Sequence, residues 1–333
     1  MTLLDLLALD FMQRALVAAL LTGLAAPAIG TFIVQRRLAL LGDGIGHVAV
    51  TGVALGLLTG ASPTWTAVVV AVLGAVLIEL IRERGHTNGD VALALLFYGG
   101  LAGGVLITGI AGQGAATLQA YLFGSLTSIS GQDVWVTAAL TVVVLVATLG
   151  LSPQLFAVAS DQDFARVAGL RVRGYNLLIA VLAAVSITVA MRTVGLLLVS
   201  ALMVVPVATS QQLARSFRTT LLGAMLVGCL ASAGGLLLSA ALSFRASVAP
   251  GPTIVLLALA MFTATWPLGA WLRRRSRLMA PFPEVAATPH RSTEHPHAHG
   301  DDCGHPAVPH GDHVDYVHDG HRHAVHGEHY DEH

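Results

Sequence analysis

Long stretches without a single charged or histidine side chain dominate this sequence. Eight such stretches, each of 18 residues or more, alternate with short clusters of charge. They are residues 15–34, 48–78, 91–132, 134–160, 174–191, 193–214, 219–244 and 246–272. A helix that crosses a lipid bilayer needs about 20 mostly apolar residues. The stretches therefore predict membrane-spanning helices, with the lipid bilayer as their surroundings.

The overall composition agrees with a membrane protein. Only 11% of the 333 residues are charged, against about 25% in soluble domains. The formal net charge of −1 gives no attraction to nucleic acid, and we expect no such partner. We distinguish nine hydrophobic segments, at about residues 12–34, 38–60, 64–81, 91–111, 133–152, 175–191, 193–210, 219–243 and 252–272. The sixth and seventh are short and could be partly re-entrant, so residues 1–280 are predicted to be an all-α, polytopic membrane helical bundle of eight or nine transmembrane segments.

The arginines are distributed unevenly among the loops between these segments. If the N-terminus is outside the cell, thirteen arginines fall in the cytoplasm and three lie at the outer side. Basic residues concentrate in cytoplasmic loops, so we predict an outside N-terminus and a cytoplasmic C-terminus. Glu79 lies at the edge of the loop that contains Arg82 and Arg84, and we expect it to be interfacial or paired with them.

Two ionisable residues lie inside the second hydrophobic segment. Asp43 and His47 are one helical turn apart, about 6 Å along the axis. An ionised carboxylate that faced lipid there would cost about 3 kcal/mol, so the pair must face a cavity or a partner. Carboxylate oxygen and imidazole nitrogen suit zinc, manganese or ferrous iron. A buried Asp–His hydrogen bond that fixes the helix and a proton relay are the alternatives.

Residues 281–333 differ in composition from everything before them. They hold thirteen of the fifteen histidines, ten acids and very few apolar side chains. We predict a cytoplasmic, disordered, His-rich tail that binds ions as a loose buffer or sensor; a tail without a function is the alternative. The irregular spacing argues against one rigid site. The candidate ligands are His295, His297, His299, His305, His310, His313, His318, His321, His323 and His326.

Several motifs between residues 12 and 272 point to one family. They read QRRLALLGDGIGHVAVTGVALG, TNGDVALALLFYGG, YLFGSLTSIS, SDQDFARVAGLRVRGYNLL, VGLLLVSALMVVPVATSQQLARSF and APGPTIVLLALAMF. In this order and spacing they resemble the metal-ion family of ABC importer permeases, which carry zinc, manganese or iron. Where that family commonly reads Ser-His-Ala, this chain reads Gly46-His47-Val48, so it lacks a hydroxyl that could orient a ligand.

The resemblance implies a transport subunit that is not itself an enzyme. Such permeases work as homodimers in a bacterial-type inner membrane, with a cytoplasmic ATP-binding subunit and an extracytoplasmic metal-binding protein. All eighteen basic residues are Arg, so the Lys that a P-loop needs is missing and ATP must bind to another subunit. The resemblance places Asp43 and His47 in the ion path, and it implies a transported divalent metal with no permanently bound cofactor.

The resemblance also suggests which residues contact the ATPase. Asp163, Phe164, Ala165 and Arg166, followed by Gly169, are similar to the cytoplasmic segment through which ABC permeases contact that subunit. An ordinary inner loop is the alternative. Residues 211–218, which include Arg215, are the other docking candidate.

The choice of cargo depends on the tail. Its imidazoles favour zinc over manganese, which prefers oxygen ligands, and a manganese or iron permease is the alternative within the family. A proton-coupled secondary transporter, with Asp43 and His47 as the relay, would need no ATPase. A permease for organic metal complexes or vitamins leaves the tail unexplained. An enzyme is disfavoured because no other polar cluster in the membrane supplies an acid, a base and a nucleophile.

Overall fold

The computed structural model of the chain describes residues 8–83, 89–112, 121–124, 129–244, 248–279, 290–292, 299–300, 302–310, 313–318, 321–326 and 329–332. It separates into two compact units, Met1–Leu272 and Arg273–His333.

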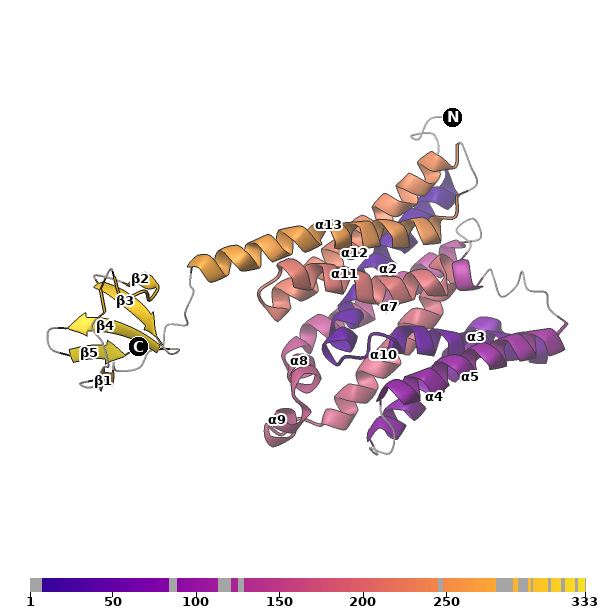
Figure 1. Cartoon of the computed structure of the whole chain (residues 1–333). Coiled ribbons are helices and arrows are strands. Elements are labelled where there is room, and N and C mark those ends of the chain that lie inside the picture. Colours follow the sequence, from indigo (N-terminus) through magenta and orange to yellow (C-terminus); the bar gives the residue numbers. More distant parts are fainter. Residues whose placement is uncertain are drawn as a thin grey trace. The chain divides into compact units, whose positions relative to one another are not determined.

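The first unit is helical (Figure 1). Its helices are α2 (Asp10–Gln35), α3 (Leu41–Thr59), α4 (Pro63–Glu83), α5 (Gly89–Ile110), α7 (Gly131–Gly150), α8 (Ser152–Ser160), α9 (Gln162–Val167), α10 (Val172–Val194), α11 (Leu196–Leu213), α12 (Phe217–Leu242) and α13 (Pro250–Met279). The last turns of α13 belong to the second unit.

Nine helices in the described part of the chain are long and apolar enough to cross a membrane. They coincide with the nine hydrophobic segments, so the polytopic helical bundle predicted from the sequence is confirmed. The sixth and seventh segments form α10 and α11, of 23 and 18 residues. These helices are separated by Gly195, whose φ of +89° suits glycine. A Cβ there would lie 2.4 Å from the Phe123 carbonyl carbon, so the turn depends on glycine.

Helix α2 packs against α12, α11, α7 and α10. Its Ile29, Phe32 and Ile33 are fully buried. A Cβ at Gly30 would lie 2.0 Å from the carbonyl oxygen of Met203 on α11, so the two backbones touch. Lipid tails are as apolar as leucine, so helices in a bilayer associate through such close contacts between small residues.

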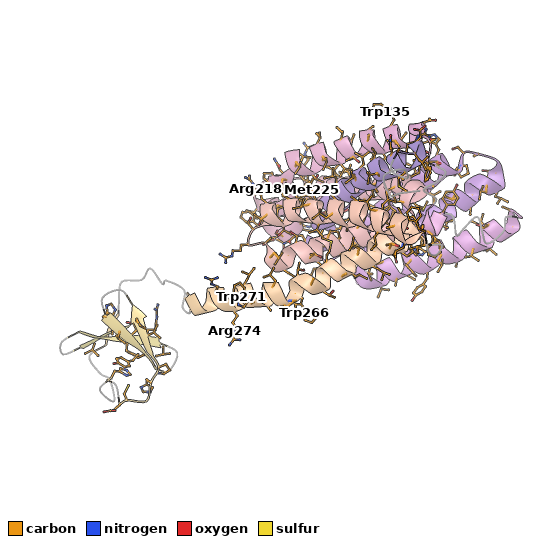
Figure 2. All side chains as sticks on the ribbon, turned by 90° about the horizontal axis from the view of Figure 1, so that it is seen from above. Trp135, Arg218, Met225, Trp266, Trp271 and Arg274 are labelled. Carbon is orange, nitrogen blue, oxygen red and sulfur yellow. The ribbon has the colours of Figure 1, made fainter. Side chains whose placement is uncertain are left out.

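The outer surface of the first unit is apolar. Leu73 on α4, Leu95 on α5 and Val146 on α7 are all more than half exposed, as expected for side chains that face lipid. The four tryptophans are 54–78% exposed. Figure 2 shows Trp266 and Trp271 projecting from α13 and Trp135 at the surface of the bundle. Tryptophan concentrates where membrane meets water, so these positions fit a membrane-embedded bundle.

The described residues of the second unit include a five-stranded antiparallel sheet in the order β1-β5-β4-β3-β2 (Figure 1). The strands are β1 (His290–Ser292), β2 (Ala307–His310), β3 (His313–His318), β4 (His321–His326) and β5 (His329–Glu332). Composition predicted disorder in this segment, and the strands are a difference from that expectation. Val314, Tyr316 and Val317 in HVDYVH and Val325 in HRHAVH are residue types that are enriched in strands, which the composition of the whole segment conceals.

Candidate ion site in helix α3 and the arginine-rich end of the bundle

Asp43 and His47 lie in the first two turns of α3, as their spacing suggested. Helix α3 packs against α4, α5, α10 and α11, and Figure 1 shows α3, α4 and α5 side by side. The His47 side chain is only 8% exposed, whereas that of Asp43 is 30% exposed. Asp43 lies in the first turn, where the helix dipole stabilises a carboxylate. The site thus has a buried imidazole and a more accessible acid.

One hydrogen bond determines which nitrogen of His47 is available. Its Nδ1 lies 2.9 Å from the backbone carbonyl oxygen of Asp43. A carbonyl can only accept, so Nδ1 must carry the hydrogen. The lone pair of the neutral ring is then on Nε2, which is the arrangement found in metal-binding histidines whose other nitrogen donates to the backbone. His47 is therefore oriented as a potential ligand through Nε2.

The side chains of Asp43 and His47 are close without forming a hydrogen bond. The Asp43 Oδ1 is 3.8 Å from the His47 Nδ1, beyond hydrogen-bond range. A direct Asp–His hydrogen bond that only fixes the helix does not describe this geometry, because the backbone carbonyl takes the Nδ1 hydrogen instead. The carboxylate keeps its capacity for an incoming cation.

Helix α5 forms one wall of the site. The Phe97 ring lies 4.3 Å from the His47 ring, centroid to centroid, at an interplanar angle of 50°. Thr51 donates a hydrogen bond of 2.6 Å to the carbonyl oxygen of Gly100. A Cβ at Gly100 would lie 2.6 Å from the Val48 nitrogen and 2.7 Å from the His47 carbonyl carbon. Glycine at position 100 lets α5 contact the backbone of α3 at the site. Neither Gly100 nor Phe97 was predicted from the sequence as part of the site.

Position 46, where the family commonly has serine, is tightly packed in this chain. A Cβ at Gly46 would lie 1.9 Å from Cδ1 of Leu196, and Leu196 is fully buried. A larger residue at position 46 would therefore require the first turn of α11 to repack.

The predicted ATPase-contacting residues lie on a short, exposed element. Helix α9 is capped by Asp161, whose Oδ1 accepts from the backbone nitrogens of Asp163 (2.9 Å) and Phe164 (3.0 Å). Arg166 pairs with Asp163 at 2.6 Å, and Ala165 is buried. Phe164 is 64% exposed and Val167 89% exposed, so this element presents apolar side chains on its outer surface.

A tight turn fixes the end of α9 and places Gly169 beside it. Gly169 has a φ of +80°, and the Leu170 nitrogen donates to the Ala165 carbonyl oxygen at 2.9 Å. Ala165 packs with Val158 of α8 and Val172 of α10 in a small apolar cluster. The segment is thereby held on both neighbouring helices.

Arg215 lies in the short connection between α11 and α12 and is exposed. Two residues later, the Phe217 ring packs 4.5 Å from the Phe156 ring of α8 and 5.3 Å from the Phe32 ring of α2. The connection that contains Arg215 is thus anchored beside the helix that leads into α9. Among the residues that the structure describes, no hydrogen bond or ion pair joins Arg215 itself to α9.

A buried ion network joins the end of α2 to α4 at this end of the bundle. Arg36, directly after α2, donates to Glu79 of α4 at 2.7 Å, and Arg82 donates to the same carboxylate at 3.0 Å. The Arg36 and Glu79 side chains are 2% and 7% exposed. Burial lowers the pKa of the Arg36 guanidinium, and the Glu79 carboxylate acts in the opposite direction. The Glu79–Arg82 pair was expected from the sequence, but the Arg36 contact was not.

A cleft of about 350 Å³ adjoins this network. It is lined by Glu79, Arg82, Glu83, Gln162, Arg166, Arg171, Val172, Arg173 and Asn176. Arg173 of α10 pairs with Glu83 of α4 at 3.1 Å. Four of the nine lining residues are Arg and two are Glu, so the cleft is predominantly basic and opens beside α9.

The predicted ligands of the tail fall into three groups. His295 and His297 lie outside the described residues. His310, His318, His321 and His326 lie on the strands, at positions where only the backbone is described. The side chains of His299, His305, His313 and His323 are described, and His299 and His305 come together with Cys303, which was not among the predicted ligands.

Comparison with known proteins gives one consistent family. The sequence profile of the ABC 3 transport family matches residues 8–267. The chain is 32% identical to the manganese import system permease protein ScaB of Streptococcus parasanguinis, over 81% of this chain and 95% of that protein. It is 28% identical to the high-affinity zinc uptake system membrane protein ZnuB of Haemophilus influenzae, over 75% of this chain and 96% of that protein.

The fold has a counterpart among solved structures. The structure described as PsaBC from Streptococcus pneumoniae in complex with Fab is similar to this chain, with a TM-score of 0.72 and 29% sequence identity. The likeness covers 82% of this chain and 98% of the compared one. The similarity therefore extends over the membrane helices as a whole.

Proposed function

Since this chain belongs to the ABC 3 transport family, we propose that it is the permease subunit of an ATP-driven importer of divalent metal ions, with zinc as its cargo. Its relatives of known name are permeases and membrane components of metal uptake systems. ATP hydrolysis belongs to a separate subunit. The chain itself supplies the path through the bilayer and the surface that the ATPase moves.

The observation that carries this proposal is the orientation of His47. Its Nδ1 donates to the Asp43 carbonyl oxygen, which leaves Nε2 as the ligand atom in a buried position, and the Asp43 carboxylate lies on the same side of the helix one turn earlier. A nitrogen and an oxygen together are a donor set for zinc, manganese or ferrous iron. Two ligands give brief rather than tight binding, as transport requires.

Zinc prefers four ligands, and one chain offers two in α3. A homodimer would bring a second Asp43 and His47, and we propose that the two pairs approach each other across the dimer axis during transport. Phe97 beside His47 then limits access of water and helps to fix the imidazole plane.

The coupling of this path to ATP is proposed to run through α9. Phe164 and Val167 are exposed apolar side chains on an element fixed by a cap, a turn and an apolar cluster. They suit a socket on the ATPase. Movement of α9 would pass to α8 and α10 through the apolar cluster that joins them. The ion pairs from α10 to α4 and from α4 to the end of α2 would then transmit it toward α3.

The basic end of the bundle is proposed to face the cytoplasm. The ion pairs bring Arg36, Arg82 and Arg173 to the same end of the bundle, and basic residues concentrate on the cytoplasmic side. This orientation puts the N-terminus outside, the C-terminus inside, and an extracytoplasmic metal-binding protein on the opposite face.

Zinc is proposed over manganese because of the thirteen histidines in residues 281–333, which suit zinc better than an oxygen-preferring ion. The test is metal uptake in a bacterial strain without its own zinc and manganese importers, with the ATPase and the binding protein co-expressed. Zinc uptake restored by the chain, with little manganese uptake, is expected. Manganese uptake alone would refute the choice of zinc, and uptake of neither metal would refute the transport function.

A further inference from the structure

A compact cluster of metal-binding side chains lies in the C-terminal unit. His299, Cys303 and His305 each offer one ligand atom, and these atoms lie within 4.8 Å of one another. The Cys303 Sγ is 3.7 Å from the His299 Nδ1, and the rings of His299 and His305 are 5.2 Å apart between centroids. We propose that these three residues form a specific binding site for zinc or another thiolate-preferring ion.

The spacing matches the coordination geometry of zinc. Zinc lies about 2.1 Å from a histidine nitrogen and about 2.3 Å from a cysteine sulfur, so a tetrahedral angle puts the two ligand atoms about 3.6 Å apart. The measured separation of 3.7 Å between Cys303 Sγ and His299 Nδ1 is close to this value. An ion could therefore join these two atoms with almost no rearrangement, and His305 would need only a small side-chain movement.

The local backbone brings the three ligands together. The Cys303 nitrogen donates to the Gly300 carbonyl oxygen at 3.1 Å, which closes a turn after His299. Gly304 then has a φ of +76°, a conformation that glycine adopts without strain, and it leads the chain back so that His305 faces the same place. The sequence H-x₃-C-x-H thus becomes a ligand set through a turn and one left-handed glycine.

The sheet holds the first ligand in place. The His299 side chain is buried, and its ring is stacked on the Tyr316 ring of β3 at 5.3 Å, with an interplanar angle of 4°. The His323 ring of β4 is stacked 5.4 Å away on centroids. Second-layer contacts that fix a ligand ring are a common feature of metal sites, and here two neighbouring strands provide them.

The donor set decides which ion fits. Two imidazole nitrogens and one thiolate favour zinc, whereas manganese prefers carboxylate, carbonyl and water oxygens. Binding requires the Cys303 thiolate, so the thiol proton passes to solvent as the metal–sulfur bond forms. Three protein ligands leave one of zinc's four positions for water or another donor, which distinguishes an exchangeable site from a closed structural one.

The site would make the C-terminal unit responsive to zinc in particular. This goes beyond the loose, histidine-only binding expected from the composition of the tail, because one sulfur-containing centre would fill before the remaining imidazoles. The inference extends the proposed function without depending on it, since it can be measured without transport.

The test uses the full-length permease in detergent micelles with Cys229→Ser, which leaves Cys303 as the chain's only thiol. The alkylation rate of Cys303 by a maleimide is measured with and without one equivalent of zinc. Because the thiolate is the reacting species and a bound thiolate is masked, zinc should slow alkylation about tenfold. The same amount of manganese should leave the rate unchanged.

Matched histidine variants in the same background separate this centre from general imidazole binding. His299→Ala with His305→Ala should abolish the zinc protection, whereas His290→Ala with His329→Ala, which removes two histidines elsewhere in the tail, should retain it. Unchanged alkylation in the presence of zinc would overturn the proposal. Protection that survives His299→Ala with His305→Ala would overturn the assigned ligands.

A second measurement does not depend on reactivity. Cobalt(II) added to the wild-type protein should give a sulfur-to-cobalt charge-transfer band that is retained in Cys229→Ser and lost in Cys303→Ser. The absence of the band from the wild type would contradict thiolate ligation. If the protein shows the band but does not transport zinc, the proposed transport function would be contradicted and the metal site would still be supported.

Discussion

The buried carboxylate of Glu79 should be among the most sensitive positions in the membrane domain. It accepts hydrogen bonds from Arg36 at 2.7 Å and from Arg82 at 3.0 Å, and Arg36 is 2% exposed. Glu79→Gln keeps the shape of the side chain but removes its charge. The Arg36 guanidinium would then be buried without a counterion, while Arg82, which is 20% exposed, could still reach water.

The expected loss is large because of this burial. Removal of one partner from a buried ion pair typically costs 3–5 kcal/mol. The glutamine oxygen can still accept one hydrogen bond, so we expect the lower end of that range, about 3 kcal/mol in the free energy of unfolding. Glu83→Gln is the matched control on the same helix. Its partner Arg173 is 63% exposed and Glu83 itself 42% exposed, so that change should cost at most about 1 kcal/mol.

The assay is denaturant titration of the purified permease in detergent micelles, followed by tryptophan fluorescence. A third variant, Arg36→Met with Glu79→Met, replaces the buried pair by apolar side chains and should recover much of the stability lost in Glu79→Gln. Equal stability of Glu79→Gln and Glu83→Gln would refute the reasoning, because it would mean that burial of this network has no energetic consequence.

Three further predictions concern other parts of the chain. Gly100→Val should separate α5 from α3 and destabilise the fold by about 1–3 kcal/mol, since a Cβ there would lie 2.6 Å from the Val48 nitrogen; a denaturant titration equal to wild type would contradict this packing. Phe164→Asp should weaken co-purification of the ATPase without changing the stability of the permease, because this side chain is exposed; undiminished co-purification would remove α9 as the docking element. Deletion of residues 285–333 should leave uptake at low zinc intact, and a complete loss of uptake would make the tail part of the transport path.

The sequence predicted the membrane architecture because the constraint is local. Each span must satisfy its own backbone hydrogen bonds and be apolar over its length, so the uncharged runs located α2, α12 and most of the other spanning helices directly. Asp43 and His47 were recognisable for the same reason. A lone acid and a lone imidazole within a span conflict with the lipid environment, and a functional explanation follows.

The remaining features depend on contacts between distant residues. Arg36 and Glu79 are 43 positions apart, and neither segment contains a sequence pattern that predicts their contact. The fit of Gly100 against His47 requires the relative placement of α3 and α5. In the tail, the ligands predicted from the sequence are histidines alone, because the turn at Gly300 and the left-handed Gly304 that bring Cys303 to His299 and His305 are not visible in a ligand count.

The measurement that tests the central claim most directly is ATP-driven zinc uptake into proteoliposomes that contain the permease, its ATPase and its binding protein. Wild type is compared with Asp43→Ala, His47→Ala and the control His86→Ala, which removes the only other histidine before the tail. The ion-path account predicts uptake with wild type and His86→Ala, and none with Asp43→Ala or His47→Ala, although all four assemble with the ATPase. Wild-type uptake by both Asp43→Ala and His47→Ala would contradict it.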